Sequence, residues 1–137
     1  MPRWPAERLD RAYYLPGVEL PIFYGDLDPN NHVNNVAVGR FFEQSRVEVH
    51  RHHDIGRTMR AHGVNAFVVQ VNMSYLHQIW WGQPLYVATR IGSVGRSSFV
   101  ELQAAWQGDT CVALCETTAA TVSDDVSAPL PDALRDI

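Results

Sequence analysis

A short polar segment concentrates the side chains that could do chemistry. Residues 24–35 contain two carboxylates, Asp26 and Asp28, one imidazole, His32, and four asparagines. A carboxylate can act as a general base on water or attack an electrophilic carbon as a nucleophile. An imidazole can orient water or polarise a carbonyl group. A connecting loop has no need of so many specific hydrogen-bonding groups, so the segment is a candidate active site.

A helix is expected directly after this segment. Apolar or small side chains recur there at helical spacing, at Val38, Phe41, Phe42, Ser45 and Val49. Asn34 or Asn35 can cap the helix, which should run to about residue 53. Because the first N–H groups of a helix are free and carry partial positive charge, the start of this helix could stabilise an oxyanion beside Asp28.

The same side chains also have structural uses. Asp28 could simply order the loop by accepting bonds from nearby backbone N–H groups, and His32 could bond to backbone or hold Asp28 in place. Asn30 and Asn34 are expected to shape the turn, since asparagine tolerates left-handed backbone. Asp26 is expected to hydrogen-bond the loop.

Five strands are expected around the helix. Residues 18–25 alternate, with Pro21 indicating an edge position or a bulge. The other strand patterns cover residues 66–76, 84–93, 97–107 and 110–122. Turn residues at Gly95 and at Gly108-Asp109 predict that the last three strands form successive antiparallel hairpins. A lone helix with one apolar stripe and a five-stranded antiparallel sheet packs best when the sheet curls around the helix, which gives an α+β fold.

Length and composition set the wider limits. The chain has 137 residues and is 46% hydrophobic, which suits one domain over residues 1–137 with its own core. Residues 1–17 are expected to form an irregular arm, and residues 129–137 a short helix. The net charge of -4 argues against a general nucleic-acid binder. The sequence shows no signal peptide and no membrane-spanning segment, so a cytoplasmic location is expected.

The two cysteines, Cys111 and Cys115, are expected on one face of the last strand, opposite Val112 and Leu114. At about 3.3 Å per residue they would lie roughly 13 Å apart, too far for a disulfide. They should be buried free thiols of a reducing compartment.

Several other polar groups have competing interpretations. His50 and His53, with Asp54, could hold a metal ion, but basic side chains near a helix C-terminus more often satisfy its carbonyl groups. We therefore expect no metal site and no cofactor. Trp80 and Trp81 could line a pocket, but an interface or core position is favoured.

Two further patterns could bind ions or ligands. Glu43 and Arg46 are spaced to form an ion pair on a helix. Arg96, Ser97 and Ser98 follow a glycine in a predicted hairpin, where they could contact phosphate or form an ordinary charged turn.

The segment from Asp26 to Asn35, followed by Phe42-Glu43 and Arg46, resembles the signature of hotdog acyl-CoA thioesterases of the 4-hydroxybenzoyl-CoA thioesterase type. Residues 75–85 and 94–98 are also similar to that family, and the resemblance extends over residues 18–123. The spacing of Asp28, Asn30 and His32 additionally resembles plant acyl-carrier-protein thioesterases. Val38 departs from the family, which often has a tyrosine there, and residues 1–17 match nothing in it.

The resemblance implies a hotdog fold and hydrolysis of an acyl-CoA. It implies Asp28 as base or nucleophile, the backbone N–H near Asn35 as oxyanion donor, and His32 as an assisting group. Another hotdog branch uses a helical glutamate as base, which makes Glu43 a second candidate. Arg96, Ser97 and Ser98 would lie near the coenzyme A nucleotide.

The resemblance also implies a homodimer with the active site at the subunit interface, and it allows a homotetramer. Two alternatives remain open at this level. One is a hotdog dehydratase or hydratase acting on acyl thioesters, and the other is a non-catalytic module that binds them.

Overall fold

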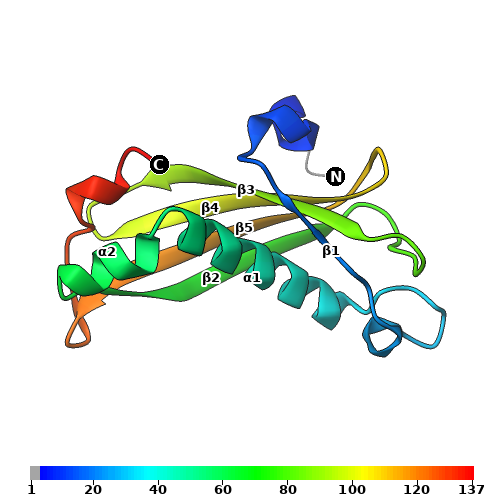
Figure 1. Ribbon diagram of the computed structural model, residues 1–137, viewed down its shortest axis with the longest axis horizontal. Coiled ribbons are helices and arrows are strands. Elements are labelled where there is room, and N and C mark those ends of the chain that lie inside the picture. Colours follow the sequence, from blue (N-terminus) through cyan, green and yellow to red (C-terminus); the bar gives the residue numbers. More distant parts are fainter. Residues whose placement is uncertain (1–3) are drawn as a thin grey trace.

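One long helix lies against a curved antiparallel sheet in the computed structural model, which describes residues 4–137 (Figure 1). The helix α1 covers Asn35–His52, and a short second helix, α2, covers Ile55–Ala61. The strands are β1 Val18–Leu20, β2 Asn65–Tyr75, β3 Leu85–Val94, β4 Ser98–Gln107, β5 Thr110–Ser123 and β6 Val126–Ser127. Single 3-10 turns lie at Ala6–Leu9, Arg11–Tyr13, Tyr24–Asp26 and Asp132–Leu134.

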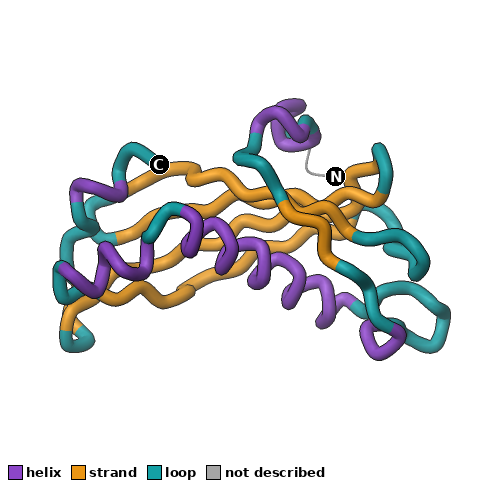
Figure 2. Tube along the Cα trace, in the orientation of Figure 1, coloured by secondary structure: helices purple, strands orange, loops and turns teal. Residues whose placement is uncertain are grey.

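The strands follow the order β1-β3-β4-β5-β2, with β6 paired to β5 (Figure 2). The hairpins β3–β4 and β4–β5 confirm the predicted succession of the last three strands. Strand β2 pairs with β5, the last long strand, and not with its chain neighbour β3. Its other edge forms one border of the sheet.

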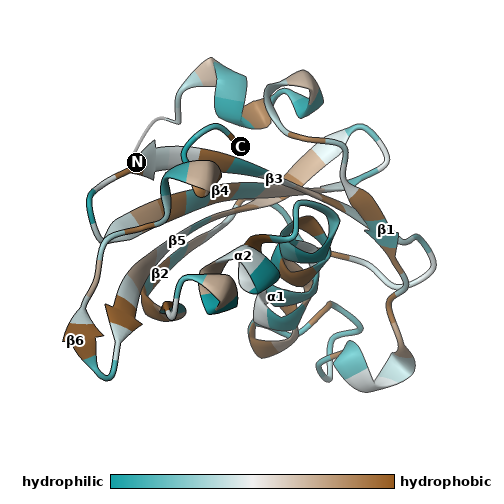
Figure 3. Ribbon diagram, turned by 60° about the vertical axis from the view of Figure 1, so that its left-hand side comes forward, coloured by the Kyte–Doolittle hydropathy of each residue, from teal (hydrophilic) through white to brown (hydrophobic). Residues whose placement is uncertain are grey.

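Helix α1 forms as its sequence predicts. Asn34 is the cap, and its side chain accepts a 2.9 Å bond from the N–H of Val36. The predicted stripe is buried, and Phe42 and Val38 are almost completely enclosed. They pack with Leu85 and Val87 of β3 in the main core. Figure 3, in which α1 is seen nearly end-on, shows the sheet bending around the helix. The expected α+β hotdog fold is confirmed.

Local irregularities correct two strand predictions. Strand β1 ends at Leu20, one residue before Pro21, and a 3-10 turn at Tyr24–Asp26 replaces the end of the predicted strand. Strand β5 changes register between its pairings with Ala105 and Trp106 of β4. This irregularity places Cys111 in the outer apolar cluster and Cys115 in the main core, so the two cysteines do not share a face. Both are free thiols.

The N-terminal arm packs on the face of the sheet away from α1. Tyr14 lies edge-on to Trp106, with 5.7 Å between ring centroids. The guanidinium group of Arg8 is buried and donates to the carbonyl oxygens of Gln103 and Cys115, at 3.2 Å each. The first three residues of the predicted arm lie outside the described part of the chain.

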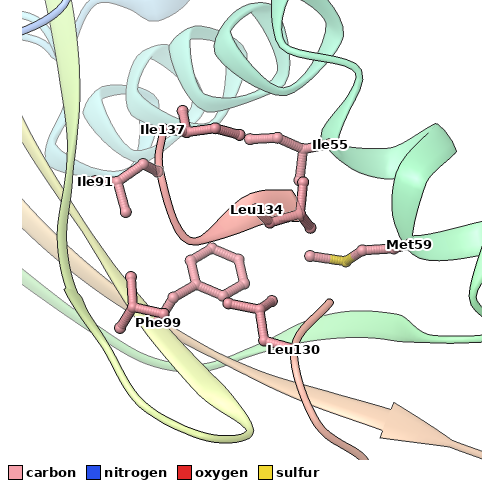
Figure 4. A pocket seen from close by; sticks show the side chains of 8 residues that line it. Ile55, Met59, Ile91, Phe99, Leu130, Leu134 and Ile137 are labelled. Carbon is pink, nitrogen blue, oxygen red and sulfur yellow. The ribbon is translucent and has the colours of Figure 1, made fainter. Parts of the chain in front are cut away.

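The C-terminal segment closes a second, smaller apolar core at the α2 end of the sheet (Figure 4). Leu130 and Leu134 contact Ile55 and Met59 of α2 and Phe99 of β4. The predicted short C-terminal helix is thus a single 3-10 turn. Among residues 4–137, no helix has both the length and the apolar composition that a membrane crossing requires.

Candidate active site

The loop before α1 is organised around the carboxylate of Asp28. Its Oδ1 accepts from the N–H of Asn30 at 2.8 Å and from the N–H of His32 at 3.1 Å. The Asp28 N–H donates in turn to the carbonyl of His32 at 2.8 Å. Asp28 can therefore order the loop and still act in catalysis. Oδ1 holds the turn, and Oδ2 has no partner among residues 4–137.

Asp26 holds the base of the same loop. It is buried, accepts from the N–H of Phe23 at 2.9 Å, and forms an ion pair with Arg40 of α1. Its carbonyl accepts from the N–H of Asn34 at 2.8 Å. The predicted scaffolding role of Asp26 is confirmed, and it fixes the loop to the helix start. The left-handed residue of the turn is Asn31, with a φ of 62°, and not Asn30 or Asn34.

The helix that follows the same loop starts with a backbone donor. Asn35 is the first residue of α1, and its N–H has no acceptor among the described residues. The hydroxyl of Tyr75, at the end of β2, lies 3.5 Å from the Asn35 carbonyl. A free N–H at the positive end of an 18-residue helix is a suitable site for an anionic oxygen.

His32 lies in the same loop and contacts an aromatic ring. Its imidazole is edge-on to Trp80, with the ring centroids 4.2 Å apart. Trp80 and Trp81 are 54% and 56% exposed, so of the two positions favoured for them the core is wrong, while the interface stays a prediction. Trp80 instead helps to form a wall beside the Asp28 loop, and the bonds of its backbone to Gln107 hold it there.

Asp28 and His32 thus share one loop that leads into the helix start at Asn35, whereas Arg96, Ser97 and Ser98 do not join them within one protomer. The β3–β4 turn lies at the far end of β3, about 30 Å away at 3.3 Å per residue. The backbone carbonyls of Arg96 and Ser97 accept from Leu130 and Thr121, which anchors the turn. The Arg96 side chain is exposed.

The predicted pair between Glu43 and Arg46 is not formed. Arg46 points into the core, where it donates to Gln103 at 3.0 Å and to Thr117 at 3.2 Å. Glu43 is exposed beside a surface hollow that Asp26 and Arg40 also line. Sequence spacing could not show this, because the i,i+3 rule places residues on a helix face without saying what the face contacts.

The histidines near the helix end have other partners. His50 lies 2.8 Å from the carboxylate of Glu101, while His52 and His53 stack edge-to-face with each other. Over residues 4–137, no group of three or more His, Cys, Asp or Glu side chains is placed to hold a metal ion.

The cysteines are poor nucleophile candidates. Burial raises the pKa of the Cys111 thiol to about 11, and burial also raises the pKa of Cys115. Both are therefore protonated near neutral pH, and neither belongs to the Asp28 loop.

Sequence reasoning missed two neighbours of this loop, Tyr75 and Arg40. Tyr75 falls in the predicted strand 66–76, whose pattern predicts no contact with the helix start, and Arg40 lies on a helix face that had no predicted partner. The ion pair between Arg40 and Asp26 could have been predicted from the sequence. A cation near the start of a helix can pair with an acidic residue in the loop before the cap.

Comparison with known proteins agrees with the fold. Residues 24–137 match the family model of the thioesterase-like superfamily. A thioesterase from Thermus thermophilus, solved with coenzyme A and Zn, has 25% identity and a TM-score of 0.78 over 89% of this chain and 90% of its own. A 1,4-dihydroxy-2-naphthoyl-CoA thioesterase from Synechocystis has 14% identity and a TM-score of 0.76, over 86% and 90% of the two chains. A search of curated proteins gave no match.

These findings define a hotdog thioesterase, an enzyme that hydrolyses a thioester bond. The chain belongs to the thioesterase-like superfamily, since the family model covers most of its length.

Proposed function

We propose that the protein is an acyl-CoA thioesterase in which Asp28 is the catalytic carboxylate. The observation that carries this proposal is the geometry of the loop. Asp28 is held rigidly by Oδ1, its Oδ2 is free among the described residues, and the unpaired N–H of Asn35 begins a long helix seven residues later. The family match supports a thioester substrate, and the coenzyme A in the Thermus structure supports the carrier.

In the favoured mechanism Asp28 acts as a general base. Oδ2 takes a proton from water, and the water oxygen bonds to the thioester carbonyl carbon. The resulting oxyanion is stabilised by the N–H of Asn35 and the helix dipole. The C–S bond then breaks, and the leaving sulfur takes the proton from Asp28. In direct attack, Oδ2 would bond to the carbonyl carbon and the C–S bond would break to release the coenzyme A thiolate. Water would then hydrolyse the anhydride to the free acid and Asp28.

His32 assists this chemistry by position. Its backbone N–H holds Oδ1 of Asp28, and Trp80 restricts its ring. From there the imidazole can orient the attacking water next to the free Oδ2. We assign His32 a positioning role and leave proton transfer to Asp28.

A second copy of the chain completes the site in this proposal. Strand β2 is a border strand of 11 residues without a charged side chain, and Phe67, Val68, Val69, Val71 and Tyr75 on it are each more than 40% exposed. A long, apolar, unprotected edge associates readily with another strand. A two-fold axis at this edge would pair β2 with its copy and extend the sheet through both protomers.

The two-fold arrangement would also bring binding groups to the site. Antiparallel pairing of β2 brings the hairpin end of one protomer toward the loop end of the other. The partner's Arg96, Ser97 and Ser98 would then lie on the side of Asp28 from which a nucleotide approaches. A guanidinium with adjacent hydroxyls suits the phosphates of coenzyme A.

The direct experiment is to incubate a panel of acyl-CoAs with the protein and a thiol reagent. Release of free coenzyme A, lost in Asp28→Asn, supports the proposal. Formation or loss of a double bond without thiol release would indicate a dehydratase or hydratase, and binding without turnover a non-catalytic module. Either of these outcomes would overturn the assignment.

A further inference from the structure

A second polar cluster lies at the other end of α1, outside the Asp28 loop. It borders a pocket of about 240 Å³ between α1, α2 and the sheet. The polar groups at this pocket are Arg46 and His50 of α1, Arg60 of α2, Glu101 of β4 and Asn65 at the start of β2. The proposed catalytic steps use none of them.

Glu101 is the unusual member of this cluster. It is only 2% exposed, and its Oε1 is 2.8 Å from His50. Its other oxygen, Oε2, is buried and has no hydrogen-bond partner among the described residues. A buried acceptor without a partner is rare and unfavourable, and it marks a place where a donor from a ligand or from water is missing.

The rest of the pocket is apolar. Ile55 and Met59 of α2 and Phe99 of β4 line it, and the same three side chains border the small core under the C-terminal segment (Figure 4). Val64 and Val68 lie on the side of β2. A mostly apolar wall with one buried carboxylate suits an aliphatic chain that carries a polar group.

The charges of the cluster select that polar group. An ionised carboxylate has no hydrogen to donate to Oε2 of Glu101, and an ammonium would lie near the guanidinium groups of Arg46 and Arg60. A neutral hydroxyl can donate to Oε2 of Glu101 and brings no charge into the cluster. The pocket therefore favours a hydroxyl.

The mouth of the pocket lies along β2, at residues 65–68. Within one protomer this mouth is far from Asp28, because Arg46 and His50 come 11 and 15 residues after Asn35, or about 17 and 23 Å along the helix.

In a two-fold pairing centred near Gln70, residues 65–68 of one copy lie beside the partner's Tyr75. Tyr75 contacts the helix start at Asn35 in its own chain. An acyl group held at one active site would thus reach this pocket in the other subunit.

We propose that this pocket receives the distal end of the substrate's acyl group, and that Glu101 selects an acyl group bearing a hydroxyl. This inference rests on the proposed function, since it names the acyl-CoA class that the same active site hydrolyses. Glu101 is a specificity-determining residue in this scheme.

The test compares pairs of acyl-CoAs of equal chain length, from six to twelve carbons, with and without a terminal hydroxyl. For the wild type, kcat/KM should favour the hydroxylated member of at least one pair about tenfold to a hundredfold, as expected for a hydrogen bond to a buried charge. Glu101→Met, which removes the acceptor at similar volume, should reduce this ratio to near one.

A second variant protects the test against misfolding of Glu101→Met. Gly56 lines the pocket on α2, and a Cβ built there meets only the flexible end of Arg60. Gly56→Leu should therefore fold, fill the pocket and abolish the preference for the hydroxylated member of each pair. Equal rates for both members of every wild-type pair would overturn the inference, as would a preference that survives in Gly56→Leu.

Failure of the proposed function gives a different result. If no acyl-CoA releases coenzyme A, thermal shift is measured with 12-hydroxydodecanoate and with dodecanoate. A larger shift with the hydroxy acid that disappears in Gly56→Leu would support the pocket and reject the thioesterase chemistry. Equal shifts would reject the pocket, and bound water would then be the partner of Glu101.

Discussion

Two substitutions of Asp28 separate its chemical role from its structural one. Asparagine keeps an oxygen that can accept from the N–H groups of Asn30 and His32, and it removes only the negative charge and basicity. Alanine removes both bonds as well. If Asp28 does chemistry, both variants lose activity, and only the alanine variant loses appreciable stability.

The magnitudes follow from the contacts. Loss of a general base lowers kcat by about 10²–10⁴-fold, and both variants should show this loss. Each of the two bonds in the half-buried loop contributes about 1 kcal/mol, so Asp28→Ala should lower the free energy of unfolding by about 2 kcal/mol. For a domain of this size that is a decrease in Tm of about 7 °C. Asp28→Asn should stay within about 2 °C of the wild type.

The assays are thiol release with saturating acyl-CoA and thermal unfolding followed by circular dichroism. His32→Gln is a useful comparison, because it leaves both backbone bonds to Asp28 intact. An Asp28→Asn variant with wild-type Tm and near-wild-type turnover would refute the assignment and leave Asp28 as a loop-ordering residue. An asparagine variant as unstable as the alanine variant would refute the hydrogen-bond reasoning.

Four further outcomes are expected. Asn34→Ala should lower the free energy of unfolding by about 1 kcal/mol, because it removes the α1 cap; an unchanged denaturant midpoint would contradict this. Cys111 and Cys115 should react slowly with a thiol reagent at about pH 8, and stability should fall as pH rises above about 9. The reason is that the unfolded thiols ionise at a lower pH than the folded ones; fast native labelling would be inconsistent with the raised pKa values. Arg96→Ala should raise KM for acyl-CoA about tenfold with kcat little changed, and an unchanged KM would remove Arg96 from the coenzyme A site. Val69→Lys should convert the proposed dimer to a monomer in light scattering and abolish activity; an active monomer would show that one chain holds a complete site.

Several elements could be predicted because their determinants are local. The stripe from Val38 to Val49 and the asparagine before it define α1 to within one residue at its end. Gly95 and Gly108 locate the two hairpins. Asp28, His32 and Asn35 lie within eight positions of one another, so a single loop and helix start brings them together without help from distant residues.

Other features depend on contacts between distant residues, and the sequence pattern misplaces them. Register changes in β5 send Cys111 and Cys115 to opposite faces, although strict alternation places them together. Arg46 turns toward Gln103, 57 positions away, and not to Glu43. The order of strands in the sheet determines which distant residues come into contact. Local patterns with a period of two or 3.6 residues do not specify that order.

The sequence by itself determined the central helix, the strands and the carboxylate-bearing loop that precedes the helix. It could do so because capping, turn chemistry and hydrophobic periodicity act over a few residues. Only the tertiary structure decided that β2 forms the free edge beside β5, that Arg96 lies at the far end of the sheet from Asp28, and that His50 meets a buried Glu101. These features arise from burial of apolar surface across the whole chain, which fixes sheet order and encloses polar groups that no local pattern brings together.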